Sequence, residues 1–381
     1  MTSPAASRIY LDYNASTPLA PSVAAKMREV MEDAFGNPSS LHWAGAPARV
    51  HVDHARARVA ELLGCDPREV VFTSGGSESN NLALKGVFFA RAREIASPHV
   101  VTTAVEHPAI VAPCEFLARQ GARITALSVD GTGRFDPDDL RRAITADTVL
   151  VSVMHANNEV GTIMPIEACA AIAREHGVAF HTDAAQSVGK IPTRVNELGV
   201  DLLSIAGHKI HAPKGVGALY IRAGTKLEPL VHGAGHEHGL RAGTESAMLA
   251  AALGEACRLA GDLSEIPRVR SLRDRFWSAL RQRFGDRVAL NGHPELRLPN
   301  TLNVSFVGRD GGELLARLEG VAASTGSACH AGQVELSPVL AAMRVPEHIG
   351  MGAVRFSLGR GTTGEEIDSV VSRLAGVLEN T

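Results

Sequence analysis

The stretch at residues 179–221, AFHTDAAQSVGKIPTRVNELGVDLLSIAGHKIHAPKGVGALYI, decides the fold class. It contains three short apolar runs of strand length, at residues 179–182, 202–205 and 217–221. Asp183 follows the first run directly, and the Gly-His-Lys sequence ending at Lys209 follows the second. In open α/β sheets, ligand-binding groups lie at the carboxyl ends of the strands. The stretch therefore predicts strands of one sheet with a binding site at their ends.

The same pattern extends toward the N-terminus. Four more runs of strand length occur at residues 70–73, 100–103, 124–127 and 149–154. Helical patterns fall around and between them at residues 46–63, 77–93, 108–120 and 165–176. Strands that alternate with helices indicate crossover units and a largely parallel sheet covered on both faces. We therefore expect an α/β fold with a mostly parallel seven-stranded sheet.

The pattern changes after about residue 244. Helical patterns at residues 244–263, 269–284, 312–318 and 363–378 surround a strand-like run at 302–307. This arrangement predicts a smaller C-terminal α/β domain, with the extended N-terminal piece at residues 9–14 packed near it. We expect a large domain at residues 16–260 and a small domain formed by residues 1–15 and 261–381.

Composition excludes several classes of protein. The 381 residues are 45% hydrophobic and carry a formal net charge of −3, which gives no electrostatic case for binding nucleic acid or an anionic membrane. No apolar run is long enough to span a bilayer, and we expect no signal peptide. The five cysteines are widely spaced without a Cys-x-x-Cys pair, which argues against disulfides or a metal site and favours the cytoplasm.

Two motifs carry groups suited to a cofactor, and each also has an ordinary structural interpretation. FTSGGSESNN at residues 72–81 runs from a strand through two glycines into a helix, where free N–H groups bind phosphate. An ordinary turn with Ser77 as the N-cap explains the same residues. Asp183 suits a pyridinium nitrogen, because a buried carboxylate needs a cationic or N–H partner. Capping of the following helix explains Asp183 equally well.

Lys209 lies among glycine, histidine, isoleucine and proline, away from any solvated helix face. Lysines in such settings have lowered pKa values and form Schiff bases, although a structural lysine with an exposed tip is the alternative. A phosphate cradle, an acid for a ring nitrogen and a lysine together indicate a pyridoxal 5′-phosphate site. The joint match is more specific than any one element.

Cys329 lies in the small-residue run ASTGSACHAG at residues 323–332, where we expect a mobile loop. Cys114, Cys169 and Cys257 fall inside helical patterns and are expected in the core, and Cys65 follows a helix in a turn. His330 would help lower the pKa of the Cys329 thiol, whose thiolate is the reactive form. The alternative is a glycine-rich hinge with an incidental cysteine.

The motif set resembles the NifS/IscS-like cysteine desulfurases of the class-V aminotransferase family. The matching motifs are TAVEHP at 103–108, MHANNEVG at 154–161, HTDAAQSVGK at 181–190, GHK at 207–209 and GSAC at 326–329. The resemblance runs in order from IYLDY at 9–13 to RFSLGR at 355–360. It implies a fold-type I pyridoxal-phosphate enzyme and a homodimer with active sites at the subunit interface.

The resemblance also implies roles for individual residues. Lys209 would hold the cofactor covalently and remove the substrate α-proton, and Cys329 would take sulfur from L-cysteine as a persulfide for an acceptor protein. The other implied contacts are Asp183 with the ring nitrogen, His107 stacked on the ring, Gln186 with the ring hydroxyl, Gly76, Ser77, His208 and the other subunit's Thr244 with the phosphate, and Asn158, Arg355 and nearby Asn37 with the substrate.

Three features depart from the common family pattern. Ala206 stands where many members have a phosphate-binding serine, and His238 replaces a more usual arginine. The chain also ends soon after its last expected helix, whereas housekeeping members carry a longer tail that engages an iron–sulfur scaffold. This shorter end favours a dedicated sulfur donor over general iron–sulfur assembly. A selenocysteine lyase is the second interpretation, and an aminotransferase or an inactive scaffold are less favoured alternatives.

Overall fold

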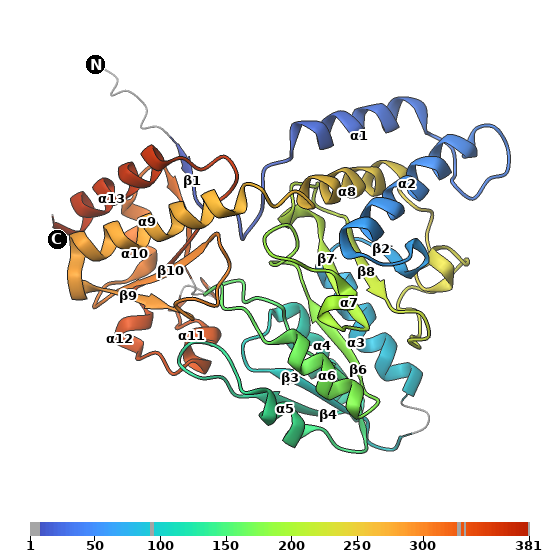
Figure 1. The fold of residues 1–381 in the computed structure, drawn as a ribbon, viewed down its shortest axis with the longest axis horizontal. Coiled ribbons are helices and arrows are strands. Elements are labelled where there is room, and N and C mark those ends of the chain that lie inside the picture. The colour runs from blue at the N-terminus through green and yellow to red at the C-terminus, as the bar shows by residue number, and fades with distance from the viewer. Residues whose placement is uncertain (1–7, 92–94, 326–328, 331–332, 380–381) are drawn as a thin grey trace.

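The computed structural model describes residues 8–91, 95–325, 329–330 and 333–379, and of residues 329–330 and 333–334 it describes the backbone alone. Two lobes are visible, a larger one around a seven-stranded sheet and a smaller one that contains the C-terminal helices (Figure 1). The expected α/β fold with a mostly parallel seven-stranded sheet is confirmed.

The large sheet has the strand order β2-β8-β7-β6-β5-β3-β4. Its members are β2 (Val70–Thr73), β3 (His99–Thr103), β4 (Arg123–Leu127), β5 (Thr148–Ser152), β6 (Ala179–Asp183), β7 (Leu202–Ala206) and β8 (Gly217–Ile221). β8 runs antiparallel to both of its neighbours, and the other pairs are parallel. All seven lie on the runs identified in the sequence.

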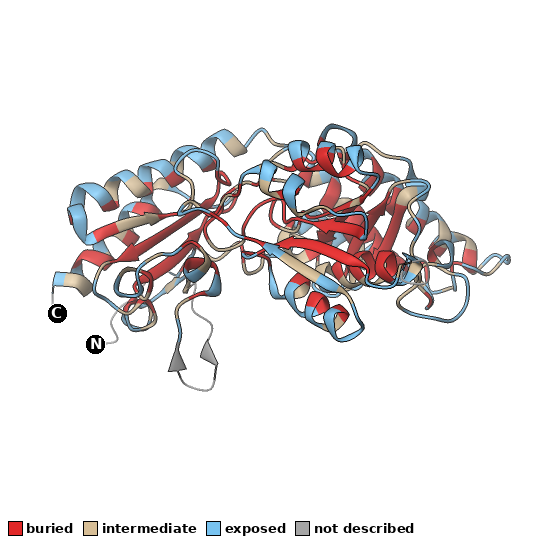
Figure 2. Cartoon of the chain, turned by 90° about the horizontal axis from the view of Figure 1, so that it is seen from below, coloured by how far each residue is buried: buried red, intermediate tan, exposed pale blue. Residues whose placement is uncertain are grey.

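Apart from the edge strand β4, which is partly exposed, the strands are buried on both faces (Figure 2), because helices cover each side of the sheet. Successive side chains point to opposite faces, so Val70 and Phe72 join one core while Val71 joins another. The first core includes α2 (Gly45–Leu63), α6 (Ile166–Glu175) and α8 (Ala247–Ala260). The second includes α3 (Gly76–Arg91) and α4 (Pro108–Arg119).

The smaller lobe has its own antiparallel sheet and core. The sheet order is β12-β15-β10-β9, made by β9 (Val288–Asn291), β10 (Thr301–Phe306), β12 (Ser324–Thr325) and β15 (Ala353–Ser357). α9 (Ile266–Phe284) and α13 (Gly364–Glu379) pack against each other beside it. α9 buries Phe276 and Leu280, which are four residues apart and therefore share one helix face.

The N-terminal segment connects the two lobes. β1 (Ile9–Tyr10) pairs in parallel with β11 (Val321–Ala322), and Asp12 forms a β-bridge with Ser357. This pairing confirms that residues 9–14 pack near the C-terminal part of the chain. The helices within the described ranges are all too short or too polar to cross a bilayer.

Several elements differ from the sequence expectation. The helix expected from residue 244 begins at Ala247, because Ser246 Oγ accepts a hydrogen bond from Leu249 N–H and caps it. The sequence did not predict α1 (Pro21–Asp33), α5 (Pro137–Ala143), α7 (Val195–Leu198), α11 (Pro338–Ala342), α12 (Glu347–Gly350), or the short hairpin of β13 (Cys329–His330) and β14 (Gln333–Val334). The end of the helix expected at 77–93 falls partly outside the described residues.

Candidate active site

A cavity of about 390 Å³ opens at the carboxyl ends of β6 and β7, between the two lobes. It brings together most of the residues expected to form the site: Gly76, Ser77, His107, Asn158, Asp183, Gln186, His208, Lys209 and Arg355. The remaining lining residues include Asn14, Asn80, Met154 and Ala206. Residues from both lobes therefore form one site.

Lys209 ends the short 3-10 turn Gly207–Lys209 that follows β7. Its Nζ donates to the backbone oxygens of Asn14 at 2.7 Å and Ala15 at 2.9 Å. Burial, followed by the positive charge of Arg355, lowers the pKa of this amine to about 8. A sizeable fraction of the Lys209 side chain is therefore the neutral amine near physiological pH, which is the form that attacks a carbonyl group.

Asp183 is the last residue of β6 and is buried. Asn80 Nδ2 donates to Asp183 Oδ2 at 2.7 Å, and Ala185 N–H donates to Oδ1 at 2.9 Å. Hydrogen bonds to both oxygens fix the orientation of the carboxylate, and a buried carboxylate suits a cationic or N–H partner such as a ring nitrogen. The residues after Asp183 form turns, and the next helix begins only at Val195, so the helix-cap interpretation of Asp183 is wrong.

His107 is the N-cap of α4 and faces the cavity. Its Nδ1 accepts a hydrogen bond from Ala109 N–H at 3.0 Å. Burial, and to a smaller extent Lys209, lowers the pKa of the His107 imidazole. The neutral ring therefore carries its proton on Nε2, because Nδ1 is occupied as an acceptor.

The N-terminus of α3 forms a wall of small residues. Gly75 has a φ of +148°, a conformation that side chains rarely adopt, and a Cβ at Gly75 would meet open space. A Cβ added to Gly76 would lie 3.2 Å from the Cβ of Ala206. The backbone is therefore open to an anion at the helix start, and the methyl group of Ala206 contributes no hydrogen bond there.

Gln186 is oriented by two neighbours, and His208 lies in a setting that lowers the pKa of its imidazole. Gln186 Nε2 donates to the backbone oxygen of Asn14 at 3.0 Å, while its Oε1 accepts from Lys190 Nζ at 2.9 Å. Burial lowers the pKa of Lys190 to about 7, and burial with the nearby Lys209 lowers that of His208 to about 4. His208 is therefore a neutral imidazole at physiological pH.

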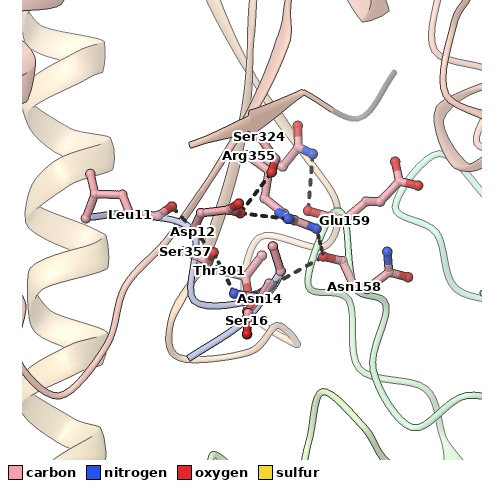
Figure 3. Close-up of polar contacts among 12 residues, drawn as sticks. Leu11, Asp12, Asn14, Ser16, Asn158, Glu159, Thr301, Ser324, Arg355 and Ser357 are labelled. Carbon is pink, nitrogen blue, oxygen red and sulfur yellow. Dashed lines mark hydrogen bonds and ion pairs between the residues drawn. The ribbon is translucent and has the colours of Figure 1, made fainter. Parts of the chain in front are cut away.

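Arg355 and Asn158 form the wall opposite the large sheet, and Figure 3 shows their contacts. Arg355 Nη1 donates to the backbone oxygen of Asn158 at 2.9 Å, and Nη2 contacts Asp12 Oδ1 at 2.8 Å. The Nε atom of Arg355 is buried without a hydrogen-bond partner among the described residues. The guanidinium thus retains a buried donor that a ligand oxygen would satisfy.

Asn37 and Thr244 do not line this cavity. They lie together in a second hollow, between the end of α1 and the start of α8. The expectation that Asn37 shares a pocket with Asn158 and Arg355 is not met within one chain, because the segment after α1 extends away from the cavity. The expected approach of Thr244 from another subunit stays a prediction.

The described cysteine thiols are poor nucleophiles. Cys114, Cys169 and Cys257 are buried as expected, and Cys65 is partly buried in the turn after α2. Burial raises the pKa of each of these four thiols to about 12. Cys329 begins the short strand β13, and its side chain lies outside the described part of the chain.

Sequence reasoning missed three residues of the site. Asn80 lies one helical turn after Ser77, so the motif at residues 72–81 contained a signal for it in the i, i+3 spacing. Asp12 and Asn14 were noted only as part of an extended segment. Asn14 is 1% exposed and contacts Thr301, Asn300 and Asn158. These contacts span more than a hundred residues, and no local pattern predicts them.

These residues fit pyridoxal 5′-phosphate. Lys209 supplies an amine for the aldehyde, Asp183 a carboxylate for the ring nitrogen, and the start of α3 a cradle for the phosphate. Asn80 Oδ1 also lies buried at this site with no partner among the described residues. The fold and this set of side chains are those of the fold-type I class of pyridoxal-phosphate enzymes.

Comparison with known proteins identifies the family within that class. The chain belongs to the aminotransferase class-V family, whose model matches residues 9–370. The cysteine desulfurase IscS of Dictyoglomus turgidum is 48% identical over 375 residues, covering 97% of this chain and 94% of the relative. A solved NifS-like protein has a TM-score of 0.92 and 36% identity, and the match covers 98% of this chain and 100% of that one.

A second solved structure, SspA in complex with cysteine, has a TM-score of 0.82 and 35% identity. The match covers 93% of this chain and all of SspA. The resemblance to NifS/IscS-like proteins is therefore confirmed, and the chain is a member of the cysteine desulfurase family.

Proposed function

We propose that this protein is a pyridoxal-phosphate-dependent cysteine desulfurase. It converts L-cysteine to L-alanine and transfers the sulfur atom to Cys329 as a persulfide, for delivery to an acceptor protein. The observation that carries this proposal is one cavity in which the low-pKa amine of Lys209, the Asp183–Asn80 pair and Arg355 face the same space.

The cofactor would be held along the large-sheet side of the cavity. The residues proposed to hold it are Lys209 covalently, Asp183 at the ring nitrogen, His107 over the ring, Gln186 at the ring hydroxyl, and Gly76, Ser77, His208 and the other subunit's Thr244 at the phosphate. When bound, pyridoxal phosphate supplies an electron-withdrawing ring that stabilises negative charge at the substrate α-carbon. The Asp183 carboxylate would pair with the ring nitrogen on which this property depends.

Arg355 and Asn158 hold the substrate carboxylate, so that the α-carbon is presented to Lys209. Lys209 Nζ then removes the α-proton, which its lowered pKa permits near neutral pH. His107 serves as a proton donor through Nε2, because its Nδ1 is already bonded to Ala109 N–H. Each group thus acts at a separate atom of the substrate.

Sulfur transfer requires a thiolate nucleophile. The Cys329 thiolate attacks the substrate sulfur, an S–S bond forms, and the C–S bond breaks with its electron pair remaining on carbon. That carbon takes up a proton, so that one thiol and L-cysteine give one persulfide and L-alanine. The high pKa of the four described thiols supports the assignment of this step to Cys329.

We infer that the protein is a homodimer. Met31, Phe35, Leu41 and Trp43 lie on α1 and the segment after it, and Leu41 and Trp43 are 91% and 81% exposed. A patch of large apolar side chains on one edge is typical of a subunit interface. The hollow with Asn37 and Thr244 adjoins this patch, so a second copy would bring both residues toward its partner's site.

Two further assignments follow from the same evidence. We propose the domain division at residues 16–260 against 1–15 and 261–381, supported by the separate core that Ile9 and Leu11 share with residues 269–375. We also propose a cytoplasmic location without direct binding of nucleic acid, supported by the four free cysteines and the net charge of −3.

Product analysis with L-cysteine tests the proposed function. Alanine formed together with persulfide sulfur supports a desulfurase, whereas 3-mercaptopyruvate would indicate an aminotransferase. A scaffold would show neither product and no visible absorbance after addition of pyridoxal phosphate. Parallel reactions with L-selenocysteine test the second interpretation, because a selenocysteine lyase would strongly prefer that substrate and would not need Cys329.

A further inference from the structure

The side chain of Asp12 contacts the guanidinium of Arg355 at the edge of the cavity (Figure 3). The Asp12 Oδ1 to Arg355 Nη2 distance is 2.8 Å, and the two side chains are only 17% and 10% exposed. The backbone oxygen of Asn158 accepts a hydrogen bond from Arg355 Nη1. The guanidinium is therefore held by two protein oxygens from different segments.

The fold places Asp12 where it reaches two strands at once. Ser324 of β12 and Arg355 of β15 are directly opposite each other in the antiparallel register, so their side chains lie on the same face of the sheet. Asp12 Oδ1 accepts a second hydrogen bond, from Ser324 Oγ at 2.9 Å. The β-bridge between Asp12 and Ser357 fixes the backbone from which the carboxylate projects.

We propose that Asp12 is a positioning residue that orients Arg355 to receive the α-carboxylate of the substrate. The proposal rests on the proposed function, in which Arg355 binds that carboxylate. An arginine side chain has many rotamers, and fixing it during folding removes that entropy cost from the binding step. Arg355 lines the cavity, and its buried Nε has no hydrogen-bond partner among the described residues.

A neighbouring acid does not duplicate this role. The Glu159 carboxylate accepts a hydrogen bond from the hydroxyl of Ser337, the residue that caps α11. The Glu159 side chain therefore points away from the guanidinium (Figure 3). Its pKa is raised, mainly by burial. Asp12 is therefore the carboxylate with a described contact to Arg355 Nη2.

Asp12 also brings a negative charge close to an incoming carboxylate, and repulsion between the two opposes binding. The test must separate this repulsion from the positioning effect. Asp12→Asn and Asp12→Ala both remove the charge, but only the asparagine retains an oxygen that can accept from Arg355 and Ser324. The two variants are matched in charge, and their difference reports positioning alone.

The experiment titrates each holoenzyme with L-alanine and with cysteamine, an amine without a carboxylate, and follows the visible absorbance of the bound cofactor. We expect Asp12→Ala to bind L-alanine roughly 3–10-fold more weakly than Asp12→Asn, the cost of ordering one long side chain. Cysteamine should bind both variants equally. The KM for L-cysteine should follow the L-alanine ratio, with kcat nearly unchanged.

Equal L-alanine affinity in the two variants would overturn the proposal. A parallel loss of cysteamine affinity would also overturn it, because a general disturbance of the site affects both amines. Asp12→Asn guards against misfolding of the alanine variant, because it keeps a side chain of the same size and an oxygen that can accept from Arg355 and Ser324. Failure of the wild type to release alanine from L-cysteine would instead contradict the proposed function.

Discussion

The two walls of the cavity are built in different ways. The wall formed by the large sheet carries Asp183 at the end of β6 and Lys209 at the end of the short turn that follows β7, within short stretches of sequence. The opposite wall joins Asp12 to Arg355, which are 343 residues apart. In our account the first wall serves the cofactor and bond chemistry, and the second serves recognition of the substrate carboxylate. Mutations in the two walls should therefore change different kinetic constants.

The largest effect is expected in the sheet wall. Lys209→Ala should lower kcat by roughly 10²–10⁴-fold or more, because it removes the group that transfers the α-proton. Steady-state alanine release at saturating L-cysteine measures this loss. Lys214→Ala is the matched control, since Lys214 is an exposed lysine five residues further on, and its activity should be close to that of the wild type.

The opposite wall should respond in KM. Arg355→Lys retains a positive charge but loses the planar fork that grips a carboxylate. Loss of a hydrogen bond between charged groups, worth about 1.5–3 kcal/mol, should raise KM for L-cysteine by roughly 10–100-fold. A fall in kcat at constant KM would show that both walls serve the chemical step and would remove the distinction between them.

A smaller effect is expected at Asn80, which supports Asp183. Asn80→Ala removes one hydrogen bond to a carboxylate, worth about 1.5 kcal/mol at the lower end for a charged group, and should weaken cofactor binding by roughly tenfold without changing KM for L-cysteine. Cofactor titration followed by absorbance gives the affinity. Asn81→Ala changes the next residue of α3, whose amide bonds to Ser77 O, and should leave cofactor affinity unchanged.

The smallest effect is expected on the pKa of Lys209 in the sheet wall, which the positive charge of Arg355 in the opposite wall helps to lower. Covalent capture of pyridoxal phosphate needs the free amine of Lys209, whose pKa of about 8 lies below the ordinary lysine value of 10.5. The rate of cofactor uptake by apoprotein should therefore rise with pH, with its midpoint near pH 8. Arg355→Gln removes one cause of the lowered pKa, so the midpoint should move upward. An unmoved midpoint would show that burial alone sets the pKa of Lys209.

The difference between the two cavity walls, one built from local sequence and one from distant segments, explains which parts of the site the sequence could predict. Strand runs and local motifs identified the seven-stranded sheet and the residues that follow its strands, because those signals are local. Asp12, Asn14 and the hollow at Asn37 depend on contacts between distant segments. α1 was not predicted, although its buried residues Val23 and Val30 lie seven positions apart, which is helical spacing. Long-range packing therefore decides the substrate wall, and one sequence does not encode it in a local pattern.

The intact mass of the holoenzyme after a single turnover with L-cysteine tests directly whether sulfur is transferred to Cys329. We predict that the wild-type protein gains one sulfur atom, located on Cys329 by peptide mapping, with one equivalent of alanine. Cys329→Ala should gain no sulfur and release no alanine. If the Cys329→Ala protein consumes L-cysteine as fast as the wild type, Cys329 is not the sulfur acceptor and the account of persulfide transfer is wrong.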